Sequence, residues 1–321
     1  MGPGARQIEN GEARMAQAAH DIIEVAPGRT QVGFVGVGIM GRSMAEHLRA
    51  AGYPLHVFTR TRAKAAPLEE AGATWHDSPA ALAAACDVVI TMVGYPADVE
   101  AVYFGEDGAA ETGILAHLKP GAVAIDMTTS SPSIAQRIAE AARARDAWAL
   151  DAPVSGGDVG AKNATLSIMV GGDRTAFDAV KPLFDLLGKS IALLGPAGAG
   201  QHTKMVNQTV IAGTIVGVAE GLAYGKAAGL DLAQVLDVIG GGAAGGFQLN
   251  VLGKRMVEGD FAPGFYVHHF IKDMGIAGAE AERMHLDLEV LTLARALFER
   301  FAAEGGREDG TQGIYRMIAR D

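Results

Sequence analysis

The sequence is poor in cysteine and has no long apolar run, and each shortage excludes a class of protein. Cys86 is the single cysteine among 321 residues, so no disulfide can form within the chain. A lone thiol in an apolar stretch is typical of a small core residue in a reducing cytoplasm. The longest uncharged run, Val238–Gly253, contains six glycines. It is shorter than the ~20 apolar residues of a membrane-spanning helix.

Positive charge is also scarce. The formal net charge is −10, which argues against nucleic acid or an anionic membrane as the main partner. The first residues lack the cationic start and continuous apolar segment of a secretory signal. We therefore predict a cytoplasmic protein with an N-terminal extension over residues 1–29, containing a short helix around 13–25.

No residue cluster indicates a metal site or a nucleophile motif. His268 and His269 are adjacent but have no ligand partner at metal spacing, so a packing or surface role is expected and no metal is predicted. The sequence has no G-x-S-x-G pattern. Two alternatives are open for Lys272: an exposed ion pair with Asp273, or a side chain that points into a cleft between the domains.

The length suggests roughly two domains. Over residues 30–194, β-rich runs alternate with amphipathic helical patterns, which is typical of a parallel sheet with crossover helices. The predicted strands are residues 31–35, 55–59, 88–91, 122–126, 147–150, 166–170 and 191–194, and the predicted helices are 40–51, 62–71, 133–145 and 174–187. After a glycine-rich hinge, residues 195–321 are predicted to be all-helical. They start with a long helix over 201–228, followed by helices from Asp231, Phe247, Ile271 and Thr292.

The segment after the first predicted strand contains the first candidate binding site. Gly36, Gly38 and Gly41 form a G-x-G-x-x-G pattern between an apolar strand and an amphipathic helix. In that context the first glycine makes the tight turn and the second lets a pyrophosphate approach the backbone. The third lets the helix pack closely on the strand. We predict that residues 36–41, including Val37, Ile39 and Met40, bind a dinucleotide. The alternative is a βα turn without a ligand.

The end of the second strand bears on which dinucleotide binds. No carboxylate for a ribose hydroxyl follows it, and the chain instead reads Thr59, Arg60, Thr61 and Arg62. Arginine offers a planar donor fork to phosphate oxygens, so the run favours NADP over NAD. The alternative is that both arginines only solvate a helix start, although basic residues there oppose the helix dipole.

Two further segments carry polar groups suited to a small acid. Ser155, Gly156 and Gly157 follow a strand and make a compact donor set for a carboxylate, although a simple turn is the commoner explanation. Lys204, Asn207 and Gln208 lie at i, i+3 and i+4 of the long helix and share one face. An apolar setting lowers a lysine pKa toward the range of a general acid or base. The alternative is a lysine that snorkels to solvent, and the pattern leaves both open.

With these motifs in order, the chain resembles the β-hydroxyacid dehydrogenase family over residues 31–321. The likeness rests on Gly36–Gly41, Asp151–Gly157, Gly198–Gln208 and Phe270–Asp273. It implies a Rossmann-type doubly wound sheet, followed by an all-α domain with a long interdomain helix, which pairs subunits into a homodimer or homotetramer. Several segments look most like the branch of 2-hydroxy-3-oxopropionate reductases.

The resemblance also implies residue roles. Lys204 matches the catalytic lysine, residues 155–157 the carboxylate-binding turn, and Gln208 an amide that is often Asn. Thr129 matches a threonine near the nicotinamide, and Lys272 a cleft lysine. Met92 and Val93 match a cofactor-contacting stretch that here lacks its usual proline. The implied reaction interconverts a short 3-hydroxy acid and its semialdehyde with NADP or NAD. Lys204 would exchange the proton, and residues 155–157, Asn207 and Gln208 would hold the substrate.

Three rivals share parts of this pattern. Imine reductases usually lack the lysine, 6-phosphogluconate dehydrogenases have a longer helical domain, and a non-catalytic NADP-binding protein would be expected to lose Lys204.

Overall fold

The computed structural model describes residues 22–320, and the chain divides into two compact units between Lys204 and Met205. We refer to the part up to Lys204 as unit 1 and to the part from Met205 as unit 2. Most of the helix predicted around residues 13–25 lies outside the described residues, and Ile22–Val25 is not helical. Ile22, Ile23 and Val25 pack against the unit 1 core, so the predicted extension contributes its last residues to the fold.

Unit 1 is built on one sheet with the order β3-β2-β1-β4-β5-β6-β8-β7, and β9 pairs with β8. The strands are β1 (Val32–Val35), β2 (Leu55–Phe58), β3 (Thr74–Trp75), β4 (Val88–Thr91), β5 (Val123–Asp126), β6 (Trp148–Asp151), β7 (Val154–Ser155), β8 (Leu166–Gly172) and β9 (Gly188–Leu193). From β3 to β6 every pair is parallel, and β8 runs antiparallel to β6 and β7. The predicted parallel sheet is confirmed.

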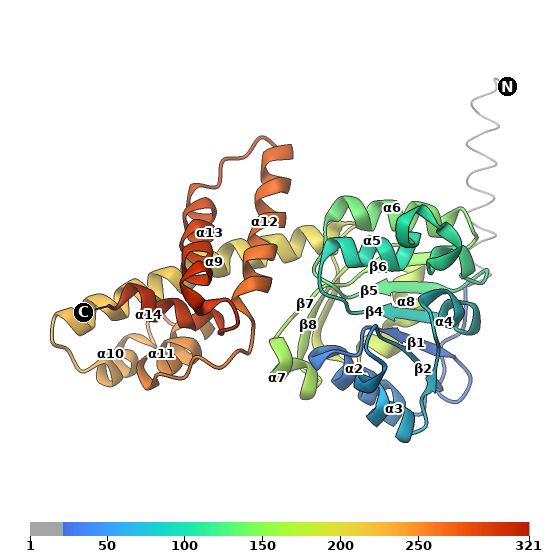
Figure 1. Cartoon of the computed structure of the whole chain (residues 1–321), viewed down its shortest axis with the longest axis horizontal. Helices are drawn as coiled ribbons and strands as arrows, with labels where there is room; N and C mark the ends of the chain where they lie inside the picture. Colours follow the sequence, from blue (N-terminus) through green and yellow to red (C-terminus); the bar gives the residue numbers. More distant parts are fainter. Residues whose placement is uncertain (1–21, 321) are drawn as a thin grey trace. The chain divides into compact units, whose positions relative to one another are not determined.

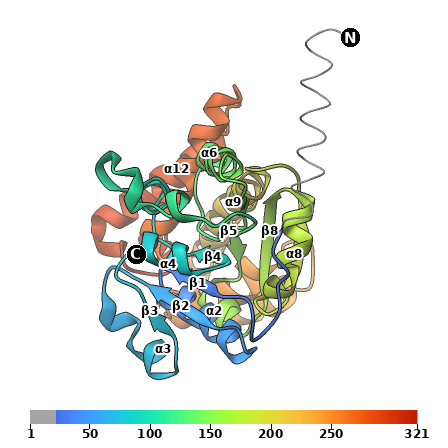
Figure 2. The ribbon, with the colours of Figure 1, turned by 90° about the vertical axis from the view of Figure 1, so that its right-hand side faces the viewer.

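Both faces of this sheet are covered, which explains why its central strands are almost entirely apolar. Val88 and Ile90 of β4 point into one hydrophobic core, while Val89 between them points into another. Figures 1 and 2 show the helices on either side of the strands. They are α2 (Ile39–Ala50), α3 (Ala66–Glu70), α4 (Pro79–Ala85), α5 (Pro96–Phe104), α6 (Pro132–Arg143), α7 (Gly157–Lys162) and α8 (Arg174–Phe184). Cys86 is a buried core residue, as expected.

Unit 2 is helical in its described part. The helices are α9 (Ala199–Ala227), which begins in unit 1, α10 (Leu232–Ile239), a π-helix (Gln248–Gly253), α11 (Lys254–Glu258), α12 (Val267–Arg283), α13 (Glu289–Phe301) and α14 (Ile314–Ile318). Helices α12 and α13 begin four and three residues earlier than predicted. At the start of α12, the amide of Val267 donates to the carbonyl of Asp309, a contact that local sequence does not reveal.

Helix α9 is the one described helix whose length and mean hydropathy would allow it to cross a membrane. One face of it, including Ala212, Ile215, Ala219 and Leu222, lies in the hydrophobic core of unit 2. The apolar residues of this face therefore have an internal packing role, as in the core helix of a helical domain.

Candidate active site

The glycine turn lies between β1 and α2, and each glycine has its own reason to lack a side chain. Gly36 has φ +96°, and a Cβ there would lie 2.3 Å from the carbonyl oxygen of Met92. A Cβ on Gly41 would lie 2.0 Å from the carbonyl oxygen of Gly36. A Cβ on Gly38, by contrast, would meet nothing within 4 Å. Gly36 and Gly41 are thus required by packing, whereas Gly38 leaves an open approach to the backbone.

The start of α2 fits an anionic ligand. Gly38 is the N-cap, and because it has no side chain it leaves the first backbone amides of the helix without a side-chain cap. Backbone amides at a helix N-terminus and the positive end of the helix dipole together favour a phosphate group. The open space over Gly38 lets such a group come close, so residues 36–41 fit the pyrophosphate of a dinucleotide.

The basic run after β2 lies beside this turn, because the amide of Gly36 donates to the carbonyl of Phe58. Arg60 forms an ion pair with Asp98 at 3.1 Å and keeps 80% of its side chain exposed. Arg62 pairs with Glu69 at 2.9 Å and lies over the ring of Trp75. Both guanidinium groups therefore have a carboxylate partner in the fold, which by itself accounts for basic residues at this helix start.

Thr59 and Thr61 flank Arg60. Thr59 is half-buried at the end of β2, and Thr61 is an exposed residue with extended backbone before a short 3₁₀ helix at Arg62–Lys64.

The ends of β4 and β5 bring Met92, Val93 and the loop at residues 127–131 to the same carboxyl edge of the sheet. We refer to this loop as the Thr129 loop. The amide of Met92 donates to the carbonyl of Val35, and that of Val93 donates to Thr128 Oγ1 at 2.9 Å. At this edge the strand order reverses between β2-β1 and β1-β4, which is where ligands bind in open α/β sheets.

Two buried carboxylates support this edge, and sequence reasoning missed both. Asp126 Oδ1 accepts from Thr91 Oγ1 at 2.8 Å and from the amide of Thr128 at 3.1 Å. Burial raises the pKa of Asp126 to about 6, and the Thr91 and Thr128 donors act in the opposite direction. Asp151 lies opposite Asp126 on the neighbouring strand β6. Its negative charge also contributes to the raised pKa of Asp126.

Asp151 anchors the beginning of α9. Its Oδ1 accepts from the amide of Gly198 and its Oδ2 from the amide of Gln201, both at 2.8 Å. A Cβ on Gly171 would lie 2.6 Å from Asp151 Oδ1, and a Cβ on Gly200 would lie 2.3 Å from the carbonyl oxygen of Met169. Small residues on both sides thus allow the first turn of α9 to pack directly on the sheet.

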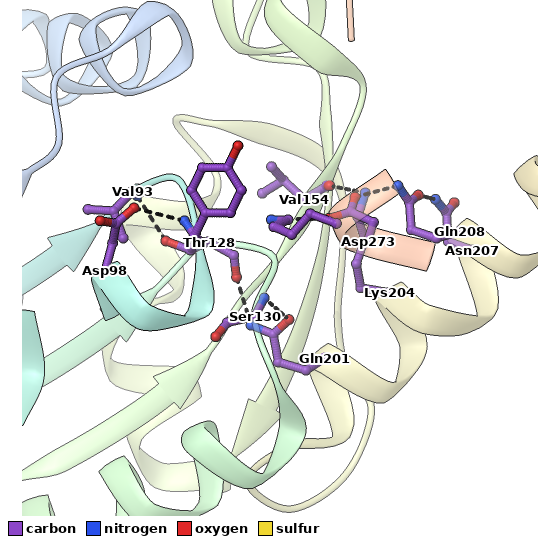
Figure 3. A network of polar contacts seen from close by, with 12 residues as sticks. Val93, Asp98, Thr128, Ser130, Val154, Gln201, Lys204, Asn207, Gln208 and Asp273 are labelled. Atoms are coloured by element: carbon purple, nitrogen blue, oxygen red, sulfur yellow. Dashed lines mark hydrogen bonds and ion pairs between the residues drawn. The ribbon is translucent and has the colours of Figure 1, made fainter. Parts of the chain in front are cut away.

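Gln201 is the third residue that sequence reasoning missed. It is completely buried, and its side-chain Nε2 donates to the carbonyl of Thr128 at 2.7 Å. Its Oε1 accepts from the amide of Ser130 at 2.9 Å. Figure 3 shows this amide reaching from α9 to the loop after β5. The spacing of three residues from Gln201 to Lys204 was the one available signal, and it gives no indication of a partner.

Ser155 ends β7, and the chain turns sharply after it. Gly156 and Gly157 have φ values of +131° and +64°, which favour glycine, and α7 begins at Gly157. Ser155 and Gly157 are half-buried and Gly156 is exposed. The three residues thus form an accessible turn, with the start of a helix pointing out of it.

Lys204 meets this turn. The residue is only 6% exposed, and its Nζ donates to the carbonyl of Val154 at 2.9 Å. A lysine that snorkels to solvent from the helix end is therefore not what the structure shows. The buried ammonium thus contacts the residue directly before Ser155, and both belong to unit 1.

Asn207 and Gln208 belong to a hydrogen-bonded chain in unit 2. Asn207 Nδ2 donates to Gln208 Oε1, and Gln208 Nε2 donates to Asp273 Oδ2, both at 2.6 Å. Asp273 Oδ1 pairs with Lys272 Nζ at 3.1 Å. The side chains of Lys272 and Asp273 are 12% and 2% exposed, so the alternative of an exposed ion pair is wrong. Gln208 is buried between two partners and reaches Lys272 through Asp273.

The adjacent histidines lie at the beginning of α12. The rings of His268 and His269 are 4.3 Å apart, and burial together with His268 and Lys272 lowers the pKa of His269 to about 4. Among residues 22–320, no group of three or more histidine, cysteine or acidic residues could hold a metal ion.

Comparisons with known proteins agree with this arrangement. A model of the NAD-binding domain of 6-phosphogluconate dehydrogenase matches residues 31–195. A model described as the NAD-binding region of NADP-dependent 3-hydroxyisobutyrate dehydrogenase matches residues 198–318. These two matches define a nicotinamide-dependent oxidoreductase.

Individual relatives narrow the class. The chain is 53% identical to the Bacillus subtilis oxidoreductase YkwC over 286 residues, covering 89% of this chain and 98% of the relative. It is 40% identical to the 2-hydroxy-3-oxopropionate reductase of Escherichia coli, and the match covers 87% of this chain and 93% of the relative. The 3-hydroxyisobutyrate dehydrogenase of Mycobacterium tuberculosis, solved with L-serine, superposes with a TM-score of 0.82 at 28% identity, covering 91% and 99%. The chain therefore belongs to the β-hydroxyacid dehydrogenase family.

Proposed function

We propose that this enzyme interconverts a short 3-hydroxy acid and its semialdehyde, with Lys204 as the general acid and base. The observation that carries the proposal is the buried Lys204 ammonium at the carbonyl of Val154, next to the turn at residues 155–157. An ammonium and a set of backbone and hydroxyl donors lie together there, as an acid with a hydroxyl on C3, two carbons from the carboxyl carbon, requires.

The proposed roles follow from the chemistry of each group. Ser155 and the amides of Gly156 and Gly157 bind the substrate carboxylate and so orient the rest of the molecule. In the reducing direction Lys204 donates a proton to the oxygen that becomes the hydroxyl, and its charge stabilises that oxygen. In the oxidising direction neutral Lys204 removes the same proton. Asn207, one turn further along α9, orients the substrate hydroxyl, and Gln208 holds Asn207.

The nicotinamide supplies the remaining chemistry by accepting or delivering a hydride. Residues 36–41 are proposed to bind the pyrophosphate of the dinucleotide. The proposed contacts toward its nicotinamide are Met92, Val93, Thr129 and Lys272. Thr59, Arg60, Thr61 and Arg62 are proposed to bind a 2′-phosphate, so we propose NADP as the preferred cofactor. In support, one matching family model is described as NADP-dependent. The exposed ion pairs of Arg60 and Arg62 can exchange a carboxylate for a phosphate at little cost, because such pairs contribute only about 0–1 kcal/mol.

We further propose a cytoplasmic homodimer or homotetramer that forms through unit 2. None of the residues of the apolar helix α10 is buried, and Val238 is 78% exposed. On α9, Val206, Val210 and Tyr224 are exposed as well. Large exposed apolar surfaces of this kind usually mark an interface. Light scattering after size-exclusion chromatography measures the assembly directly.

The enzymatic proposal is tested with a panel of tartronate semialdehyde, 3-hydroxyisobutyrate, L-serine, succinic semialdehyde and glyoxylate. Each is assayed with NADP(H) and NAD(H) by following nicotinamide absorbance. Turnover of at least one 3-hydroxy acid or semialdehyde is expected, with glyoxylate poor because it has no C3. If the purified protein binds the cofactor but converts none of the panel, the proposed reaction is wrong.

A further inference from the structure

We propose that Gln201 is a positioning residue that fixes the Thr129 loop to the first turn of α9, in register with Lys204. The inference rests on the proposed function, because it assumes that Thr129 contacts the nicotinamide and that Lys204 transfers the proton. No part of it requires Gln201 to touch the substrate or cofactor.

The side-chain amide of Gln201 holds the loop at two points that flank Thr129. It donates to the carbonyl of Thr128 at 2.7 Å and accepts from the amide of Ser130 at 2.9 Å. The Gln201 side-chain amide thus pairs with the loop as the peptide group of a neighbouring strand would, by donating one hydrogen bond and accepting another. It therefore restrains the backbone on both sides of the intervening residue, as Figure 3 illustrates.

The sheet holds only the Thr128 side of the same loop. The amide of Thr128 donates to Asp126 Oδ1, and its Oγ1 accepts from the amide of Val93. The Ser130 amide is held by Gln201, and Ser130 Oγ is buried without a hydrogen-bond partner. Without Gln201, the hydrogen bond that holds the Ser130 amide is lost, while those of Thr128 and of Ser131, the N-cap of α6, remain.

The backbone of Gln201 is itself fixed in unit 1. Its amide donates to Asp151 Oδ2 at 2.8 Å, at the start of α9. Lys204 follows three residues later, which is less than one helical turn and about 4.5 Å along the axis. A single turn of helix thus connects the Thr129 loop to the proposed proton donor. Hydride and proton transfer both depend on geometry at this scale, where small displacements lower the rate strongly.

The experiment compares Gln201→Met with wild type. Methionine has a similar length and volume and a high helix propensity, but it forms neither hydrogen bond. Gln136→Met is the matched control, because Gln136 is an exposed residue of helix α6 in the same unit. Gln201→Glu is the second variant, since it keeps an acceptor for the Ser130 amide and replaces the donor to Thr128.

Three measurements separate positioning from a general loss of structure. Binding of NADPH and NADH is measured by fluorescence, and binding of ADP-ribose, which lacks the nicotinamide, by calorimetry. The kinetic isotope effect is measured with cofactor deuterated at the transferred position. For Gln201→Met we expect affinity for the preferred reduced cofactor to fall about tenfold and that for ADP-ribose to change less than about twofold. We expect kcat to fall by about 10- to 100-fold with a larger isotope effect. Gln201→Glu should show the same pattern, and Gln136→Met should match wild type.

The proposal is overturned if Gln201→Met keeps the wild-type affinity for reduced cofactor, or if it loses ADP-ribose affinity to the same extent. Retention of both kcat and the isotope effect would also overturn it. These outcomes are distinct from failure of the proposed function. If wild type converts no compound of the substrate panel, the comparison of reduced cofactor with ADP-ribose still tests the role of Gln201.

Discussion

The side-chain ammonium of Lys204 donates a hydrogen bond of 2.9 Å to the backbone carbonyl of Val154, 50 positions earlier in the chain. The contact joins the long helix α9 to strand β7, directly before the turn at Gly156 and Gly157. It places a buried cation beside Ser155, where the substrate carboxylate is proposed to bind.

Replacing Lys204 by methionine should lower kcat by at least about 100-fold, because general acid–base catalysis typically contributes 10²–10⁴. Methionine fills the same space, so affinity for NADPH or NADH should stay within about twofold. Steady-state kinetics and fluorescence titration measure the two quantities. Lys189→Met on the exposed strand β9 is the control. Normal turnover by Lys204→Met would remove the lysine from the mechanism.

Alanine should lower the stability of the fold at Gly36 and the affinity for the dinucleotide at Gly38. At Gly36 the new Cβ would clash with the Met92 carbonyl at an unfavourable φ, so unfolding free energy should fall by about 2–4 kcal/mol. At Gly38 nothing lies within 4 Å. Gly38→Ala should therefore fold with a near-normal Tm and lose at least about tenfold in dinucleotide affinity. Thermal unfolding without ligand and cofactor titration distinguish the two effects. Unchanged affinity in Gly38→Ala would contradict the proposed pyrophosphate site.

Arg60→Ala and Arg62→Ala should each reduce the preference for NADPH over NADH by about tenfold, because each removes a charge-assisted contact to the 2′-phosphate. The measured quantity is the ratio of kcat/KM for the two cofactors. Asp98→Asn should raise that ratio, since it releases Arg60 from its ion pair. Arg29→Ala, which affects another exposed ion pair, is the control. A wild-type enzyme with a tenfold or greater preference for NADH would show that these arginines have only a structural role.

Asp126 should make stability fall as pH rises. Its pKa is raised from 3.8 to about 6 in the folded protein, so the folded state binds the proton more tightly than the unfolded state between those values. Stability from this group is thus present below about pH 4 and lost as pH rises through about 6. In Asp126→Asn the amide oxygen can still accept from Thr91 and Thr128. Relative to wild type, this variant should gain on the order of 1–3 kcal/mol between pH 4 and pH 7.5.

Urea unfolding at the two pH values measures this gain. Asp178→Asn is the control, because Asp178 is exposed and pairs only with Arg174 along its own helix. A pH dependence for Asp126→Asn that equals that of wild type would show that the buried carboxyl does not hold its proton in the folded state.

The parts of the fold that the sequence predicts are those whose residues act locally. Apolar runs located the main strands because both faces of the sheet are covered, and glycine spacing located the first turn. Strands β3 and β7 have two residues each, which is too short for any periodicity. The domain boundary was predicted near residue 195, at the glycine-rich hinge, and the two compact units divide after Lys204. The residues between 195 and 204 are held to the sheet by the carboxylate of Asp151, which lies about 50 positions earlier in the chain.

The candidate site divides in the same way. Motif spacing found Lys204 and the serine–glycine turn, and the apolar surroundings left open whether the lysine was buried. Only the three-dimensional contacts with Val154 and the loop after β5 decide that point and identify Gln201. The buried ion pair of Lys272 and Asp273 depends on packing in unit 2, and adjacent opposite charges in a sequence do not report burial.

Asp151 holds the first turn of α9 to the sheet, so the division between the units falls inside a helix, directly after Lys204. The proposed proton donor is consequently part of the dinucleotide-binding half of the chain. Residues from Met205 onward can then differ between relatives without moving the lysine. The same division indicates where to join chimaeras: exchanging the chain after residue 204 between relatives should leave Lys204 and the turn at residues 155–157 in place, so that a change in substrate preference would come from the exchanged helices.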